Sequence, residues 1–138
     1  MVGSTFEEIT LKNEGDRIRV ECGFIKEPEI RETTLRALVD TGAATLVINE
    51  EVREQLGLMV VGLHEATLAN GGKEICRIAE TVEVRWKDRF MTCQPWVLPN
   101  ATEVLLGAIP LENMDLMVDP VDQKLVGRHG DRPEGLIM

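Results

Sequence analysis

The sequence has few cysteines and histidines, the residues from which many metal sites are built. Its three cysteines, Cys22, Cys76 and Cys93, are widely spaced and include no Cys-X-X-Cys pair. The two histidines, His64 and His129, do not stand at ligand spacing from any cysteine. The sequence therefore predicts no zinc site and no metal or other cofactor. Reduced thiols are the default in a cytoplasmic protein, and we expect that location.

Long apolar runs and an excess of basic residues are also missing. The longest apolar stretches, such as residues 56–63, are interrupted by glycine and are too short to span a bilayer. The N-terminus has neither the basic segment nor the apolar segment of a secretory signal. Fifteen basic residues stand against 24 acidic ones, a formal net charge of −9. This charge argues against nucleic acids and anionic membranes as partners, because both need a basic surface.

The composition that is present fits a folded protein. Hydrophobic residues make up 43% and charged residues 28% of the 138 residues, which is typical of a soluble globular chain. A chain of this length can bury its own core, so we expect one domain over residues 1–126. Residues 127–138 are rich in glycine, proline and charge, and we expect a mobile C-terminal tail.

Short apolar or alternating segments recur between turn signals, which predicts an all-β domain, barrel-like or sandwich-like. A hairpin is expected over residues 6–25, with residues 13–16 as its turn. A strand over Glu32–Val39 follows. Further strands are expected at residues 46–48, 82–86, 90–98, 104–106, 116–118 and 124–126.

Two helices are expected, both short. Residues 49–56 combine Asn49 as N-cap, two glutamates in the first turn and Gly57 as the C-terminal stop. Residues 110–114 can form a shorter helix with proline in its first turn.

A second hairpin is predicted over residues 64–79. Asn70-Gly71-Gly72 stands at its middle, and such turns need the positive φ angles that asparagine and glycine tolerate. The flanking arms are only mildly apolar, which predicts a ribbon that projects partly into solvent.

The most informative stretch surrounds Asp40. An apolar strand ends at Asp40, and the chain turns at once through Thr41-Gly42. Apolar neighbours predict a poorly solvated carboxylate, which is costly without partners. An ordinary turn at a strand end is the simpler interpretation, because aspartate and glycine are common in turns.

Several elements in order resemble the retropepsin-like aspartic proteases over residues 17–126. Leu38-Val39-Asp40-Thr41-Gly42-Ala43 matches the catalytic motif of that family, and Leu105-Leu106-Gly107 matches its apolar-apolar-Gly motif. The 64–79 hairpin stands where the family has its flap, and residues 108–114 where it has a C-terminal helix. The resemblance implies a closed β-barrel or sandwich with a flap and one or two short helices.

The same resemblance implies an aspartic endopeptidase that acts on peptides or proteins as a homodimer. Asp40 would be the catalytic acid and base, Thr41 would hydrogen bond across the dimer, and Gly42 and Ala43 would complete the active-site turn. Because the Asp-Thr-Gly triplet occurs once, the second carboxylate must come from Asp40 of another chain. The expected substrate-binding residues are Ala44, Leu68, Ala69, Asn70, Gly71, Gly72 and Leu105.

Some of these roles have open alternatives. Leu105 is equally expected as a core residue, and the hairpin as a simple exposed ribbon. His64 is expected at the surface or where a strand begins, and Trp86 and Trp96 in the core. Retroviral members carry acids at the positions of Ala44 and Thr45 and an arginine at that of Ala108.

Three functional hypotheses follow. The first is the dimeric endopeptidase. The second is a non-catalytic peptide-binding or dimerisation module on the same fold. The third is an unrelated small β protein in which Asp40 only caps a turn.

Overall fold

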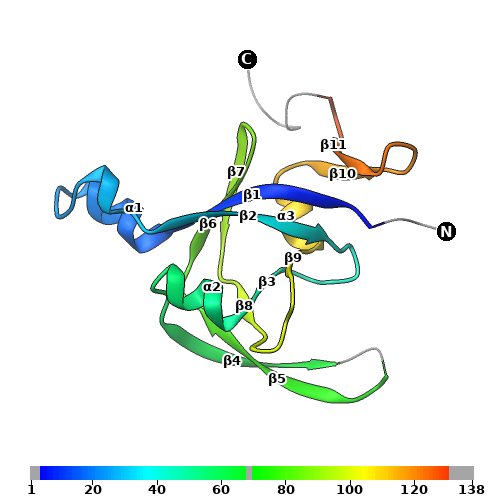
Figure 1. Cartoon of the computed structure of the whole chain (residues 1–138), viewed down its shortest axis with the longest axis horizontal. Coiled ribbons are helices and arrows are strands. Elements are labelled where there is room, and N and C mark those ends of the chain that lie inside the picture. The colour runs from blue at the N-terminus through cyan, green and yellow to red at the C-terminus, as the bar shows by residue number, and fades with distance from the viewer. Residues whose placement is uncertain (1–3, 68–69, 131–138) are drawn as a thin grey trace.

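The chain folds around one strongly curled sheet, seen in Figure 1. The structure, a computed structural model, describes residues 4–67 and 70–130. Nine strands follow the order β4-β5-β8-β3-β9-β2-β1-β6-β7, and β10 and β11 form a separate two-stranded sheet. The strands are β1 (Phe6–Asn13), β2 (Glu32–Val39), β3 (Leu46–Ile48), β4 (Val60–Thr67), β5 (Lys73–Ala79), β6 (Val82–Trp86), β7 (Arg89–Cys93), β8 (Trp96–Val97), β9 (Val104–Leu106), β10 (Leu116–Asp119) and β11 (Lys124–Gly127).

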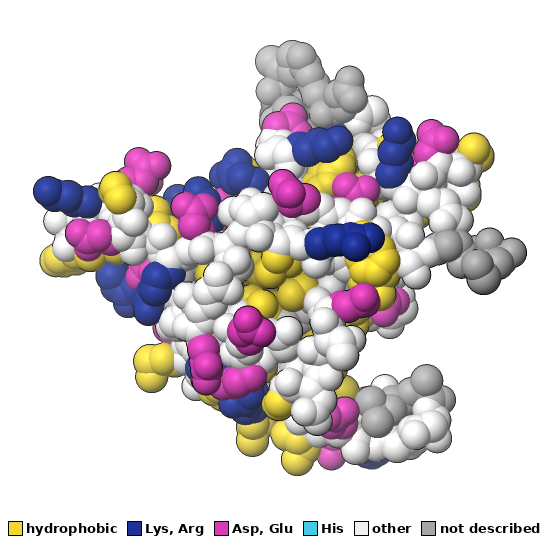
Figure 2. All heavy atoms as spheres, in the orientation of Figure 1, with side chains coloured by type: hydrophobic (Ala, Val, Ile, Leu, Met, Phe, Trp, Pro, Cys, Tyr) yellow, Lys and Arg dark blue, Asp and Glu magenta, His cyan; other side chains and the backbone are white. Residues whose placement is uncertain are grey.

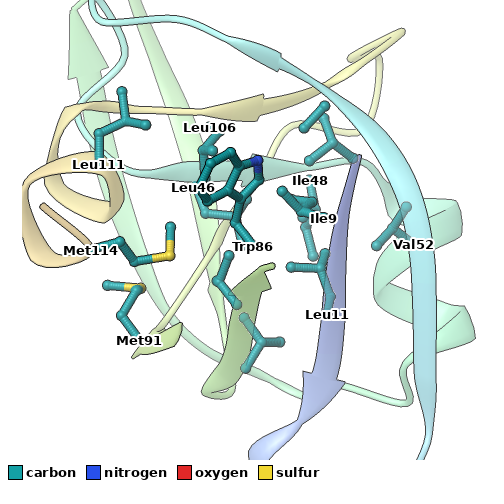
Figure 3. Packing of buried hydrophobic residues seen from close by; sticks show 14 of the residues in the cluster. Ile9, Leu11, Leu46, Ile48, Val52, Trp86, Met91, Leu106, Leu111 and Met114 are labelled. Atoms are coloured by element: carbon teal, nitrogen blue, oxygen red, sulfur yellow. The ribbon is translucent and has the colours of Figure 1, made fainter. Parts of the chain in front are cut away.

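The hydrophobic core lies inside the curl of this sheet. Figure 3 shows side chains from β1, β3, β6 and β9 meeting α2 (Glu50–Gln55) and α3 (Ala108–Asn113). Strand residues alternate between the two faces of a sheet, so every second side chain of these strands points inward. The largest fully buried side chains are Ile9, Leu11, Leu46, Ile48, Leu56, Leu58, Leu106, Met114, Leu116, Val82, Val84 and Val97.

The hairpin expected over residues 6–25 is wrong in its second half. Residues 14–21 form a helix, α1 (Glu14–Glu21), instead of a strand. The Asn13 side chain caps the helix by accepting a hydrogen bond from the Asp16 amide at 3.0 Å. Asn13 therefore starts a helix where the sequence suggested a turn, and β1 pairs with β2 instead.

A buried carboxylate fixes α1 against the start of β2. Asp16 accepts hydrogen bonds from the backbone amide and the guanidinium of Arg31, and from Arg19. The side-chain hydrogen bond from Arg31 is the main reason why the pKa of Asp16 falls to about 2. This cluster ties α1 and the 3-10 helix η1 (Glu27–Glu29) to the strand that leads to Asp40.

Both expected helices are confirmed. The Asn49 side chain accepts from the Val52 amide at 2.9 Å, and Gly57 ends α2 with φ of 64°. Helix α3 begins two residues earlier than expected, at Ala108. The strand expected over residues 90–98 is divided into β7 and β8, because Pro95 cannot donate a ladder hydrogen bond.

The predicted all-β class is confirmed, but closure of a barrel is not. The sheet curls into a half-barrel, and in the described residues its end strands β4 and β7 do not pair.

The first residues of the expected C-terminal tail are bound to the rest of the fold. Gly127 ends β11, and Arg89 donates a hydrogen bond to the Gly130 carbonyl at 2.8 Å. Residues 131–138 lie outside the described part of the chain. Over residues 4–67 and 70–130, no helix is long and apolar enough to cross a membrane.

Candidate active site

Asp40 stands where three strands meet. Strand β9 lies between β2, to which it is parallel, and β3, to which it is antiparallel. The connection from β2 to β3 therefore has to cross the end of β9. Asp40 is the first residue of this connection, and its amide donates to the Leu106 carbonyl at 3.0 Å.

The turn itself presents the Asp40 carboxylate. The Gly42 amide donates to Asp40 Oδ1 at 2.9 Å, and the Ala43 amide donates to the Asp40 carbonyl at 3.1 Å. Thr41 and Gly42 are exposed. Asp40 is half-exposed in the single chain, so the expected poor solvation is not met without a partner.

The return of the turn packs so closely on Gly107 that only glycine fits there. A Cβ at position 107 would lie 2.4 Å from the Thr45 carbonyl oxygen and 2.5 Å from that of Ala43. The first amides of α3 also hold the turn: Ala108 donates to the Ala43 carbonyl at 2.8 Å, and Ile109 to that of Ala44 at 3.0 Å. The two sequence motifs, 65 residues apart, thus form one backbone unit.

The two positions where the sequence departs from retroviral relatives differ in exposure. Ala44 is exposed, as expected of a residue that lines a binding surface. Thr45 is buried, and its side chain lies beside the Cys93 thiol. Thr45 therefore supports the turn from below and does not face outward.

Leu105 lies on the face of the sheet opposite the core. Its neighbours Val104 and Leu106 are buried core residues, and alternation places Leu105 on the other face. Strand register aligns Leu105 with further side chains of this face, which we call the transverse row. The transverse row consists of Leu38, Leu105, Val47, Trp96 and Ile78, each the register partner of the next.

The transverse row runs from the Asp40 strand to the β4–β5 hairpin. Val47 is buried, at 5% exposure, yet is not part of the main core cluster. The other four members of the row are half-buried. In Figure 1 the turn after β2 and the far end of the hairpin lie on the same side of the molecule, and Figure 2 shows the surface hollowed between them. An apolar track thus leads away from Asp40.

The β4–β5 hairpin is formed as predicted, and its arms are longer than expected. At its tip the Asn70 side chain accepts from the Gly72 amide at 2.8 Å, and Gly71 has φ of 84°. Leu68 and Ala69 lie outside the described residues. The role of the hairpin as a lid stays a prediction.

Sequence reasoning missed two residues on this face. Trp96 was expected in the core, but it is half-buried in the transverse row, where His64 stacks on it. Because β3 and β8 contain only three and two residues, their sequences show no alternation from which a face could be read. Trp86, by contrast, is a core residue as expected.

Other chemistries find little support in the described residues. Burial raises the pKa of the Cys93 thiol to about 11, and burial also raises that of Cys76, so both thiols are poor nucleophiles near neutral pH. Within residues 4–67 and 70–130, no group of three or more His, Cys, Asp or Glu side chains could hold a metal ion.

Comparisons with known proteins agree with this geometry. A family model described as "gag-polyprotein putative aspartyl protease" matches residues 27–113. The retroviral protease-like domain of Ddi1 from Leishmania major has a similar structure, with a TM-score of 0.56 and 16% identity over 96% of this chain and 91% of that one. A retropepsin-like aspartic protease from Rickettsia conorii has a TM-score of 0.49 and 21% sequence identity, and the match covers 86% of this chain and 91% of that one. No curated protein matches the sequence.

Proposed function

The chain belongs to the family of gag-polyprotein aspartyl proteases and is retropepsin-like, and on this premise we propose that it is an aspartic endopeptidase. The observation that carries the proposal is the Asp40 turn. A half-exposed carboxylate is held by one backbone amide, on a loop interlocked with Gly107 and α3. This arrangement keeps the acid in one place and leaves it open to a substrate.

Peptide hydrolysis by this route needs two carboxylates around one water. One carboxylate takes a proton from the attacking water, and the other, protonated, polarises the carbonyl of the scissile bond. Two carboxylates this close share a proton because like charges disfavour double ionisation. The Asp-Thr-Gly triplet occurs once, so the second carboxylate comes from Asp40 of a second chain.

The surface beside Thr41 fits the docking of this second chain. A shallow groove between α3 and β10 opens next to Thr41, and most of its lining is apolar. The groove is lined by Thr41, Ala108, Leu111, Glu112, Leu116, Met117, Val118 and Arg128. Met117 is 40% exposed and the nearby Ile109 49%. Covering these side chains would stabilise a dimer, and Thr41 would then hydrogen bond across the two-fold axis.

In this dimer, Gly42 and Ala43 complete the active-site turn, and Ala44 and Leu105 border the substrate. Residues 68–72 of the hairpin close over the peptide and exclude water. No cofactor takes part, since the carboxylate pair and a water supply the chemistry.

The decisive variant is Asp40→Asn, which keeps the shape of the side chain and removes the acid. We expect peptide cleavage to fall by roughly a thousandfold, while sedimentation still shows a dimer. Asp88→Asn, at an exposed turn, is the matched control and should cleave normally. Unchanged cleavage by Asp40→Asn would show that Asp40 is not the catalytic group.

Mixing the two chains tests the shared site directly. If each site needs both carboxylates, mixed dimers of wild type and Asp40→Asn are inactive. Activity should then fall with the square of the wild-type fraction after subunit exchange. A linear fall would mean that each chain has a complete site of its own.

A second candidate is a peptide-binding or dimerisation module without catalysis. Ala44, Thr45 and Ala108 lack the charges that retroviral members carry at these positions, which favours this alternative. Peptide binding without turnover, equally strong in Asp40→Ala, would support it over the protease.

A further inference from the structure

We infer that His64 selects peptides with a carboxamide side chain near the scissile bond, against peptides with an aliphatic side chain there. The inference rests on the proposed peptide-binding function of the Asp40 site. It concerns which substrates that site takes, and not how it cleaves them.

His64 lies on the face of the sheet that carries the transverse row, which begins next to Asp40. Gly62 is the register partner of Ile78, the last member of the transverse row, and His64 is the partner of Cys76. Because alternate residues share a face, His64 lies on the face of Ile78 and Trp96. Asp40 follows Leu38, the first member of the row, by two residues and lies directly after the end of β2.

A ring contact holds the imidazole in place. The His64 ring stacks on the Trp96 indole, with centroids 4.3 Å apart and planes inclined by 27°. Trp96 is half-buried beneath it, whereas His64 itself is exposed. Among the described residues, the ring nitrogens of His64 form no hydrogen bond with the protein, so they are available to a ligand.

The surroundings make this polar group selective. The transverse row is apolar, and Cys76, the partner of His64, is 1% exposed and neutral. Glu74, the remaining charged group of β5 on this face, pairs with Ala66 nearer the hairpin tip. An imidazole offers both a hydrogen-bond donor and an acceptor, which a carboxamide complements and an aliphatic side chain does not.

The distance across the sheet between Asp40 and Trp96 determines which substrate residue His64 can contact. Trp96 in β8 lies three strands from β2, the strand that leads to Asp40, which corresponds to about 14 Å at the usual strand spacing. An extended peptide advances about 3.3 Å per residue. The side chain that His64 contacts is therefore about four residues from the bond placed at Asp40.

The test compares matched peptides that differ only in glutamine or leucine at one position within about four residues of the cleaved bond. The wild-type dimer should prefer glutamine at one such position. In His64→Phe, which keeps an aromatic ring on Trp96 and removes the nitrogens, we expect this preference to fall roughly fivefold, the effect of one exposed hydrogen bond. His64→Gln restores hydrogen bonding and should keep most of the preference.

Leu63→Ala provides the matched control. Leu63 is adjacent in β4 and points to the opposite face as the partner of Arg77, so its loss should leave the glutamine preference unchanged. A merely structural role of His64 would change the stability of the protein or the cleavage of all peptides alike, and not the ratio between two peptides.

The outcomes separate the inference from the proposed function. Cleavage with an unchanged ratio in His64→Phe would overturn the inference and leave the protease in place. If peptides bind without being cleaved, the same ratio is measured as dissociation constants by fluorescence anisotropy, and a fall in His64→Phe still supports the inference. A wild-type chain that neither cleaves nor binds any of the peptides overturns both.

Discussion

The Asp40 turn and the β4–β5 hairpin face the same hollow, yet they are built in opposite ways. The turn is hydrogen bonded to Leu106, Ala108 and Ile109 and packs on Gly107 with no room for a methyl group. The hairpin is attached at one end, through the short strand β8 and the contact between Arg77 and Glu50. Its outer face carries Leu63 at 68% exposure and Ile75 at 64%.

The difference suits the two regions to separate tasks in the proposed protease. A reacting carboxylate has to be held within a fraction of an ångström of its working position. This needs a turn that is fixed by several hydrogen bonds and by close packing. An element that admits and selects peptides has to move and can differ between relatives without loss of the fold. In the proposed protease, the chemistry would therefore depend on the held turn, and peptide selection on the projecting hairpin.

The largest difference in stability between the two regions is expected when one methyl group is added to each. Gly107→Ala places a Cβ against two carbonyl oxygens of the turn and should lower the free energy of unfolding by about 3 kcal/mol. Gly62→Ala in the hairpin meets only Ile78 at 3.7 Å and should change it by less than about 0.5 kcal/mol. Urea unfolding measures both variants, and equal effects would contradict the comparison.

The next largest effect concerns the other end of β2. Asp16 has a pKa of about 2, lowered from 3.8 mainly by the hydrogen bond from Arg31. Since the charged form is favoured in the folded state, this stabilisation is complete above pH 3.8 and is lost as the pH falls towards 2. Asp16→Asn should cost about 2 kcal/mol at pH 7 and flatten the acid limb of the stability curve.

Glu21→Gln in the same helix is the control for Asp16→Asn. Its carboxylate is exposed and meets Arg17 only at 4.0 Å, so the stability at pH 7 should change little. If Asp16→Asn keeps the wild-type acid dependence, the cluster around Arg31 does not hold the strand that leads to Asp40.

A smaller effect is expected where the hairpin is attached. Hydrogen bonds from Arg53 and from Arg77 lower the pKa of Glu50 to about 2. A double-mutant cycle with Glu50→Gln and Arg77→Met should give a coupling of about 1 kcal/mol or less, because the pair is partly solvated. In Arg77→Met, hydrogen exchange should become faster in β4 and β5 but not at the Gly42 amide. Faster exchange at both sites would mean that the two regions are one cooperative unit.

The smallest effect is expected on the outer face of the hairpin. Leu63→Ser removes an exposed apolar side chain and should change the free energy of unfolding by less than about 0.5 kcal/mol. A thermal melt measures this change directly. A loss above 1 kcal/mol would show that Leu63 is covered in solution and that the hairpin is not free on that face.

Much of the fold could be predicted because local rules agreed with the tertiary structure. The Gly57 stop and the Asn70-Gly71-Gly72 turn follow from the positive φ angles that glycine tolerates. The Asn49 cap follows from a side chain that accepts a hydrogen bond from the first turn of the helix. Asn13 shows the limit of such rules. Its side chain suits a turn and a helix cap equally, and only the pairing of β1 with β2 leaves the next residues to form a helix.

The sequence by itself determined the Asp-Thr-Gly turn and its glycine partner at position 107, because both depend on residue identity alone. The proposed second chain likewise rests on the single Asp-Thr-Gly triplet in the sequence. The tertiary structure alone decided that Leu105 and Trp96 lie away from the core and that His64 shares their face. The physical reason is that a strand of two or three residues carries too little alternation to define its faces. The faces of such a strand are set by its register with neighbouring strands from distant parts of the chain.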